Sequence, residues 1–132
     1  MILLASSSEE TLKRWEEAVR ELAPVFCATH LDSAQKELVR IKPQVLLLDY
    51  SLPQLDGAHG ISGLMKLNPA TSVIILSPPL SDDIEWSLFR IGIRGCCRAD
   101  TEPGLLTTVV EAVQQGELWI RRALSRHLLD EL

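Results

Sequence analysis

The chain has 132 residues, of which 46% are hydrophobic and 23% are charged, so it is long enough for one domain with a buried core and too apolar for wholesale disorder. Thirteen Lys and Arg residues against eighteen Asp and Glu residues give a net charge of −5, which argues against the basic surface of a nucleic-acid binder. The longest apolar runs have about five residues, whereas a membrane span needs roughly 20. We therefore expect a cytoplasmic domain with no membrane segment and no signal peptide.

Two hydrophobic periods alternate along the chain. Short, continuously apolar runs predict strands buried on both faces, and apolar residues three and four positions apart predict amphipathic helices. In chain order, the pattern predicts a strand at 2–5, a helix at 9–22, a strand at 25–28, a helix at 33–41, a strand at 45–48, a helix at 61–67, a strand at 73–76, a helix at 82–91, a weaker strand at 95–97 and a helix at 103–115. A last amphipathic helix is expected over 122–132.

Polar side chains mark the expected helix starts. The candidate capping residues are Ser6, Ser7 or Ser8 for the first helix, Asp32 or Ser33 for the second, Ser81 for the fourth and Asp100 or Thr101 for the fifth. On the fourth helix, the spacing places Ile84, Leu88 and Ile91 on the buried face. The three cysteines, at 27, 96 and 97, are odd in number and lack the spacing of a metal site, so we expect reduced thiols, with the last two buried on their strand.

Strands that alternate with helices predict a parallel sheet with helices on both faces. In such sheets, binding sites form at the carboxyl ends of the strands. The chain ends its predicted strands at Ser6 and Ser7, at Asp49, at Ser77, and at Ala99 with Asp100. These residues are therefore the first candidates for a functional site.

The segment from Leu47 to Gly57 resembles the phospho-acceptor segment of response-regulator receiver domains. In that family an Asp ends the third strand, a Pro follows four residues later and a Gly eight residues later, as Asp49, Pro53 and Gly57 do here. The run 73–77 resembles the family's fourth strand with its terminal Ser or Thr. The segments 92–100 and 116–120 resemble the NarL/LuxR type, which carries a C-terminal helix-turn-helix. The resemblance covers about residues 1–120 and implies a flavodoxin-like three-layer sandwich with a five-stranded parallel sheet.

The resemblance also implies a specific chemistry, which this sequence retains only in part. In receivers, an Asp accepts a phosphoryl group, two acidic residues after the first strand help to hold Mg²⁺, and a Lys after the fifth strand neutralises charge. Alignment places Ser6 and Ser7 at the acidic pair and Ala99 at the Lys, and it leaves only Asp49 and Ser77 of the reacting set. We therefore expect lost or weak Mg²⁺ binding, no other cofactor, no enzymatic activity and a phosphorylation-independent regulatory or dimerisation module of a transcription regulator.

Three alternatives for Asp49 remain open from the sequence. The carboxylate is expected to serve structure, accepting hydrogen bonds from Ser6, Ser7 and nearby backbone N–H groups. In a conventional phospho-receiver of a two-component signalling system, it would instead accept a phosphoryl group from a histidine kinase or a small-molecule donor. As a third alternative, the serine-lined pocket, which includes Ser77, would bind a small ligand.

Apolar side chains at helical spacing suggest a homodimer. Trp86 and Phe89 lie three residues apart on the fourth helix, and Leu124, Leu128 and Leu132 are spaced by four on the last. We expect residues 1–120 to form the receiver-like domain. We expect residues 121–132 to form a C-terminal helix or the start of a connector to an output domain outside this chain. DNA would be contacted only through that output domain, and a histidine kinase or another regulatory protein is the other expected partner.

Overall fold

The computed structural model describes residues 1–130, in which five strands alternate with five helices and a sixth helix follows. The elements are β1 (Ile2–Ala5), α1 (Glu9–Val19), β2 (Val25–Ala28), α2 (Leu31–Ile41), β3 (Val45–Asp49), α3 (Gly57–Leu67), β4 (Ser72–Ser77), α4 (Asp82–Ile91), β5 (Gly95–Arg98), α5 (Pro103–Gln114) and α6 (Arg122–Asp130). The strand positions agree with those predicted from the apolar runs.

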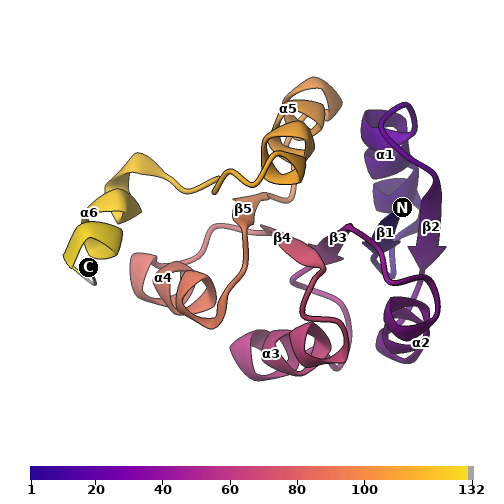
Figure 1. Ribbon diagram of the computed structural model, residues 1–132, viewed down its shortest axis with the longest axis horizontal. Coiled ribbons are helices and arrows are strands. Elements are labelled where there is room, and N and C mark those ends of the chain that lie inside the picture. The colour runs from indigo at the N-terminus through magenta and orange to yellow at the C-terminus, as the bar shows by residue number, and fades with distance from the viewer. Residues whose placement is uncertain (131–132) are drawn as a thin grey trace.

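The strands form one parallel sheet in the order β2-β1-β3-β4-β5. Helices α1 and α5 cover one face, and α2, α3 and α4 cover the other (Figure 1). Successive residues of β1 alternate between the two cores, with Ile2 and Leu4 facing α1 and α5, and Leu3 and Ala5 facing the other three helices. The predicted flavodoxin-like three-layer sandwich is confirmed.

Two of the predicted helix starts are confirmed. Ser8 Oγ accepts a hydrogen bond from the Thr11 backbone N–H at 3.2 Å, and Ser81 Oγ accepts one from the Ile84 N–H at 3.2 Å. These bonds satisfy N–H groups that have no partner within the helix.

Three other helices begin differently from the prediction. The residue before α2 is His30, whose backbone N–H donates to Ser33 Oγ at 3.3 Å, so Ser33 closes a capping box instead of preceding the helix. Glu102 precedes α5 without a side-chain capping bond, and Pro103, whose fixed φ suits the first turn, begins the helix. Helix α3 begins at Gly57, earlier than the apolar spacing indicates. Gly57 itself has a positive φ of 52°, and the weak helix former Gly60 lies within the helix.

The buried face of α4 also differs from the prediction. Ile84 is 44% exposed, whereas the neighbouring Glu85 is only 5% exposed and lies on the inner side with Leu88. The third predicted residue, Ile91, is half-buried. Apolar spacing alone could not identify this arrangement, because the burial of Glu85 depends on a cation from a distant part of the chain.

The segment after α5 packs along the free edge of the sheet and against α4. Gly95 and Trp119 form a parallel bridge, in which the Trp119 N–H donates to the Arg94 carbonyl at 2.9 Å. Helix α6 then contacts α4 and forms one end of the molecule (Figure 1). Leu124 is fully buried within the chain, so the prediction that it belongs to an exposed stripe is wrong, whereas Leu128 is 39% exposed. The third member of that stripe, Leu132, lies outside the described residues.

Within residues 1–130, no helix has the length and apolar character that crossing a membrane requires.

Candidate functional site

The carboxyl ends of the strands bring the predicted site residues to one edge of the sheet. Ser6 follows β1, Asp49 ends β3, Ser77 ends β4 and Ala99 comes directly after β5. The register pairs Asp49 with Leu76, and the Ala99 N–H donates to the Ser77 carbonyl at 2.7 Å. Ser6 and Ser77 are buried, and Ser7 is exposed.

Both carboxylate oxygens of Asp49 accept hydrogen bonds from neutral groups. Ser6 Oγ donates to Asp49 Oδ2 at 2.8 Å, and the Ser51 backbone N–H donates to Oδ1 at 2.9 Å. Ser6 Oγ in turn accepts a hydrogen bond from the Ser8 N–H at 3.2 Å. The bonds from Ser6 and from a backbone N–H are two of those predicted for a structural Asp49. The predicted bond from Ser7 is not found within residues 1–130, because this side chain is exposed.

The donor set around Asp49 does not fit the Mg²⁺ site that the family resemblance implies. Mg²⁺ prefers carboxylate oxygens in octahedral geometry, and the residues at the acidic-pair positions, Ser6 and Ser7, supply neutral hydroxyls instead. Glu9 and Glu10 lie exposed in the first turn of α1, where carboxylates interact favourably with the helix dipole. In the described part of the chain, no three His, Cys, Asp or Glu side chains are grouped so that they could hold a metal ion.

A cation that the sequence analysis missed reaches the loop after β5. Arg14 of α1 donates from Nη2 to the Ala99 carbonyl oxygen at 2.6 Å. This bond holds the loop at the position where receivers carry their Lys, but it is directed to a backbone carbonyl. The Nε of Arg14 is buried and has no hydrogen-bond partner among the described residues. No spacing in the sequence pointed to Arg14, because its partner is 85 residues away.

A second polar cluster lies between α4 and the segment before α6. Arg121 donates from Nη2 and Nε to Glu85 Oε2 at 2.7 and 3.0 Å, and also from Nη2 to Asp82 Oδ1 at 2.7 Å. Hydrogen bonds to Glu85 and then Asp82 raise the pKa of the Arg121 guanidinium further above its usual range. Because Glu85 is only 5% exposed, this pairing gives its carboxylate the charge partner that burial demands.

Of the two thiols of β5, Cys96 is buried as predicted, whereas Cys97 is half-buried. Both thiols line a cavity of about 320 Å³ together with Ser77, Glu85 and Arg121. Burial, followed by the nearby charge of Glu85, raises the pKa of Cys96 and of Cys97 to about 12. Thiolates are therefore strongly disfavoured at both cysteines. The family resemblance implies that Cys96 stands where receivers carry an aromatic switch residue.

The aromatic side chains predicted to face a partner are partly covered within the chain. Trp86 is half-buried and stacks on His127 of α6, with ring centroids 5.3 Å apart. Phe89 is half-buried against the core that α2, α3 and α4 cover. No sequence pattern pointed to His127, because its partner Trp86 lies on a different helix.

Comparisons with known proteins agree with this architecture. No family model matches the chain. The chain is 28% identical over 105 residues to the uncharacterized transcriptional regulatory protein YhcZ of Bacillus subtilis, covering 80% of this chain and 48% of the relative. It is 26% identical over 101 residues to the oxygen regulatory protein NreC of Staphylococcus epidermidis, covering 74% of this chain and 45% of that protein. The chain therefore spans about half the length of the curated relatives it matches.

Solved structures give the same result for the fold. The isolated REC domain of RcsB from Salmonella enterica serovar Typhimurium superimposes with a TM-score of 0.79 at 18% identity, covering 95% of each chain. The chain is related to NarL/LuxR-type response regulators and has the receiver fold. The resemblance inferred from the 47–57 segment is thereby confirmed. The chain differs from the pattern of these receivers in the charged residues around Asp49.

Proposed function

We propose that the chain is an atypical receiver domain that acts in a transcription regulator as a regulatory and dimerisation module without being phosphorylated. The observation that carries this proposal is the Asp49 carboxylate, which accepts hydrogen bonds from the Ser6 hydroxyl and a backbone N–H, with serines at both positions where receivers carry acidic residues. The relatives are named as regulatory proteins, which supports the assignment to gene regulation. An output domain outside this chain would contact DNA.

Loss of charge is the physical reason for expecting no phosphoryl transfer. The migrating phosphoryl group spreads negative charge over its oxygens, and receivers compensate it with Mg²⁺ and a Lys. Here Ser6 and Ser7 replace the carboxylates, and Ala99 replaces the ammonium. Each lost contact raises the barrier by a few kcal/mol, so two or three losses slow the transfer by roughly three to six orders of magnitude.

Intact-mass spectrometry after incubation with acetyl phosphate and Mg²⁺ tests this proposal. We expect no added phosphoryl group and no change in melting temperature on addition of Mg²⁺. A phosphorylated species that is absent from the Asp49→Asn variant would overturn the proposal. It would identify a conventional phospho-receiver of a two-component system, served by a histidine kinase.

A restored variant serves as the positive control. Ser6→Asp and Ser7→Asp together with Ala99→Lys rebuild the family's charge set around Asp49. Because Ser6 is fully buried, its replacement places a second carboxylate against Asp49, and the variant should be less stable without a cation. We expect Mg²⁺ to raise the melting temperature of this variant and to leave that of the original chain unchanged.

A further inference from the structure

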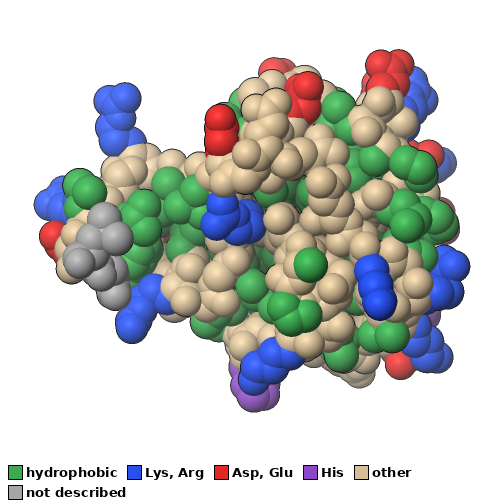
Figure 2. Space-filling view, viewed as in Figure 1, with side chains coloured by type: hydrophobic (Ala, Val, Ile, Leu, Met, Phe, Trp, Pro, Cys, Tyr) green, Lys and Arg blue, Asp and Glu red, His purple; other side chains and the backbone are tan. Residues whose placement is uncertain are grey.

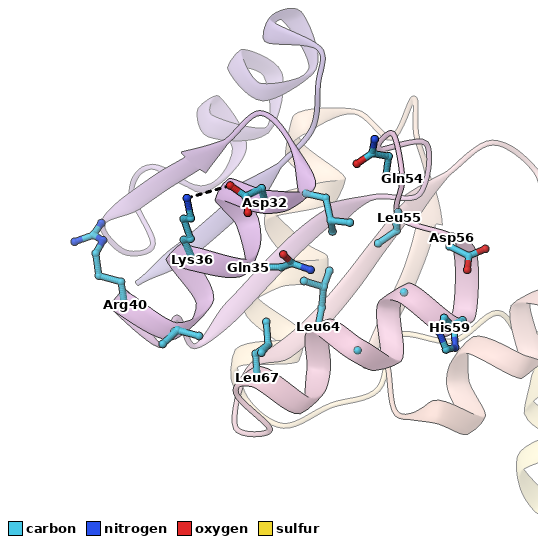
Figure 3. Close-up of a pocket in the computed structure, with 14 residues that line it drawn as sticks. Asp32, Gln35, Lys36, Arg40, Gln54, Leu55, Asp56, His59, Leu64 and Leu67 are labelled. Atoms are coloured by element: carbon cyan, nitrogen blue, oxygen red, sulfur yellow. Dashed lines mark ion pairs between the residues drawn. The ribbon is translucent and has the colours of Figure 1, made fainter.

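A groove of about 810 Å³ lies between α2 and α3, on the face of the sheet opposite α1 and α5. Its apolar lining includes Leu31, Val39, Leu55, Leu64 and Leu67 (Figure 3). Val39 is 54% exposed and Leu67 is 43% exposed, so apolar area on both walls faces solvent. The groove has no part in the Asp49 site.

Gly60 and Gly63 of α3 line the groove and leave it open. Packing requires a glycine only at position 60. A Cβ on Gly60 would lie 1.4 Å from the Leu55 carbonyl oxygen, so no other residue fits there. A Cβ on Gly63 would meet nothing within 4 Å. Because Gly also weakens a helix by about 1 kcal/mol relative to Ala, the open space at Gly63 comes at a cost in helix propensity.

Charges are distributed unevenly along the groove. Asp32 and Asp56 lie where α2 and α3 begin, and Lys36 and Arg40 follow one and two turns along α2 (Figure 3). Lys36 bonds to Asp32 at 3.1 Å, but both side chains are about three-quarters exposed, so this pair is worth little and its partners can be exchanged. Arg40 also pairs with Glu37 at 2.6 Å, and its side chain is 61% exposed. Asp56 thus makes one end of the groove acidic, and Lys36 with the paired Arg40 supplies the cations of the other end.

Helix α6 carries the complementary pattern on its exposed side. Leu129 is 69% exposed, the largest value among the large hydrophobic side chains of residues 1–130, and it lies between the exposed Arg126 and Asp130. Hydrophobic and basic side chains gather at the end of the molecule that α6 forms (Figure 2). Arg126 and Asp130 are four residues apart, as are Asp32 and Lys36, and four helical residues span about 6 Å.

The groove and α6 lie at opposite ends of one molecular face. Along this face α2 contacts α3, α3 contacts α4, and α4 contacts α6. A two-fold axis through the middle of the face, near α3 and α4, would place each α6 opposite the groove of the other copy. Such an interface is self-complementary and closed, as homodimer interfaces usually are.

We propose that the α2–α3 groove binds helix α6 of a second copy of this chain, reciprocally, with Leu129 over Gly63, Arg126 at the acidic end and Asp130 at the basic end. The inference names the surface of the homodimer proposed above and rests on that proposal. This contact would also cover the exposed apolar side chains of the groove, Val39 and Leu67, and that of Leu129 on α6.

Light scattering and sedimentation of the full 132-residue chain at high micromolar concentration test the inference. Two variants block opposite sides of the contact: Gly63→Leu fills the groove, and Leu129→Asp charges the helix. Because the reciprocal dimer contains each contact twice, either variant should raise the dimer Kd at least about 100-fold, roughly tenfold per contact. Gly104→Leu, at a helical glycine with equally open surroundings, and Leu105→Asp, at a leucine that is 45% exposed, are the matched controls on α5 and should leave the Kd within about threefold.

Mixing the two blocked variants gives a result that misfolding cannot produce. The α6 of the Gly63→Leu copy still fits the groove of the Leu129→Asp copy, so the mixture should form a heterodimer with one intact contact, about tenfold tighter than either variant alone. Dimers that survive in both variants, disruption by the α5 controls, or a mixture without heterodimer would each overturn the α6–groove contact while leaving the homodimer in place. A wild-type chain that stays monomeric would overturn the homodimer itself.

Discussion

Two carboxylates at the same end of the sheet are held in opposite ways. Asp49 is half-buried and receives only neutral donors, the Ser6 hydroxyl and the Ser51 N–H. Glu85 is almost completely buried and receives a guanidinium from Arg121. Because Asp49 keeps some contact with water, dipoles are sufficient to hold its charge, whereas a carboxylate as buried as Glu85 requires a cation.

The difference shows where the ionic interactions of this domain are used. A phospho-acceptor site needs cations near its Asp. At this edge of the sheet, however, the cation Arg121 binds the carboxylates of Asp82 and Glu85 and so connects α4 to the segment before α6. The ion pair therefore fixes the C-terminal helix on α4 and contributes nothing to holding a phosphoryl group at Asp49. Changes to the thiols, the ion pair, the Ser6 bond and the aromatic contact test this contrast.

The largest expected effect concerns the thiols of β5, which lie near Glu85. Burial, with Glu85 nearby, raises the pKa of Cys96 and Cys97 from 9.0 to about 12. At pH 8 the thiolate fraction falls about a thousandfold, and modification by a thiol reagent should slow at least as much. The exposed Cys27, whose pKa is also raised, should nevertheless react first. Mass spectrometry of the time course checks this, and rapid modification of all three thiols without denaturant would contradict it.

The same shifts predict how stability depends on pH. Since the folded pKa of each thiol lies above its value of 9.0 in the unfolded chain, both thiols support the fold fully below pH 9 and lose this contribution as the pH rises toward 12. The loss is about 1.4 kcal/mol per thiol and pH unit within that window. The double variant Cys96→Ala with Cys97→Ala should show a shallower decline in urea unfolding between these pH values.

The second effect concerns the ion pair. Arg121→Ala leaves Glu85 buried without a charge partner, and because the Arg121 side chain is 46% exposed, we expect a loss of about 2 kcal/mol in the free energy of unfolding, below the cost for a fully buried pair. Arg122→Ala, at an exposed neighbour, is the matched control and should stay within about 0.5 kcal/mol. Urea unfolding measures both, and equal effects of the two variants would show that the pair does not support the fold.

A double variant distinguishes the charge pair from simple packing. Glu85→Leu with Arg121→Leu removes the buried charge together with its partner. Such replacements are often neutral, so the double variant should recover most of the stability that Arg121→Ala loses. A double variant as unstable as Arg121→Ala would indicate that the geometry of this segment, and not its charge balance, limits stability.

The third effect is smaller because Asp49 retains contact with water. Ser6→Ala removes the bond to Asp49 Oδ2 and the acceptor for the Ser8 N–H, and we expect a loss of about 1 kcal/mol. Ser7→Ala changes the exposed neighbour and should stay within about 0.5 kcal/mol. Thermal and urea unfolding compare the two. A loss at Ser6 as large as that at Arg121 would remove the distinction between the two carboxylates.

Most of the fold could be predicted from the sequence because it depends on local patterns. Apolar runs such as 45–48 and 73–76 identify strands buried on both faces, and their alternation with helices determines a parallel sheet. The position of Asp49 at the end of a strand followed from the same pattern. Its bond to Ser6 followed from the rule that polar residues at the carboxyl ends of neighbouring strands lie together.

The parts that could not be predicted depend on contacts between distant segments. Apolar spacing favours Ile84 on the buried face of α4, but Glu85 is buried instead, and Arg121, 36 residues later, supplies the charge partner that makes this burial tolerable. Leu124 was assigned to an exposed stripe, because nothing in its own helix indicates that α6 packs on α4. Helix spacing identifies which residues share a face, but the partner that covers this face is a property of the tertiary structure.

The smallest expected effect tests whether the C-terminal helix is held by its aromatic contact as well as by the ion pair. His127→Ala removes the ring that stacks on Trp86 at 5.3 Å, and a partly exposed aromatic contact of this kind contributes about 0.5–1 kcal/mol. We expect that loss in urea unfolding and a small red shift of the total tryptophan emission, because water gains access to the Trp86 indole while Trp15 and Trp119 are unchanged. Arg122→Ala on the same helix should change neither quantity. If His127→Ala left both unchanged, the attachment of α6 to α4 would depend on Arg121 and the buried Leu124 alone.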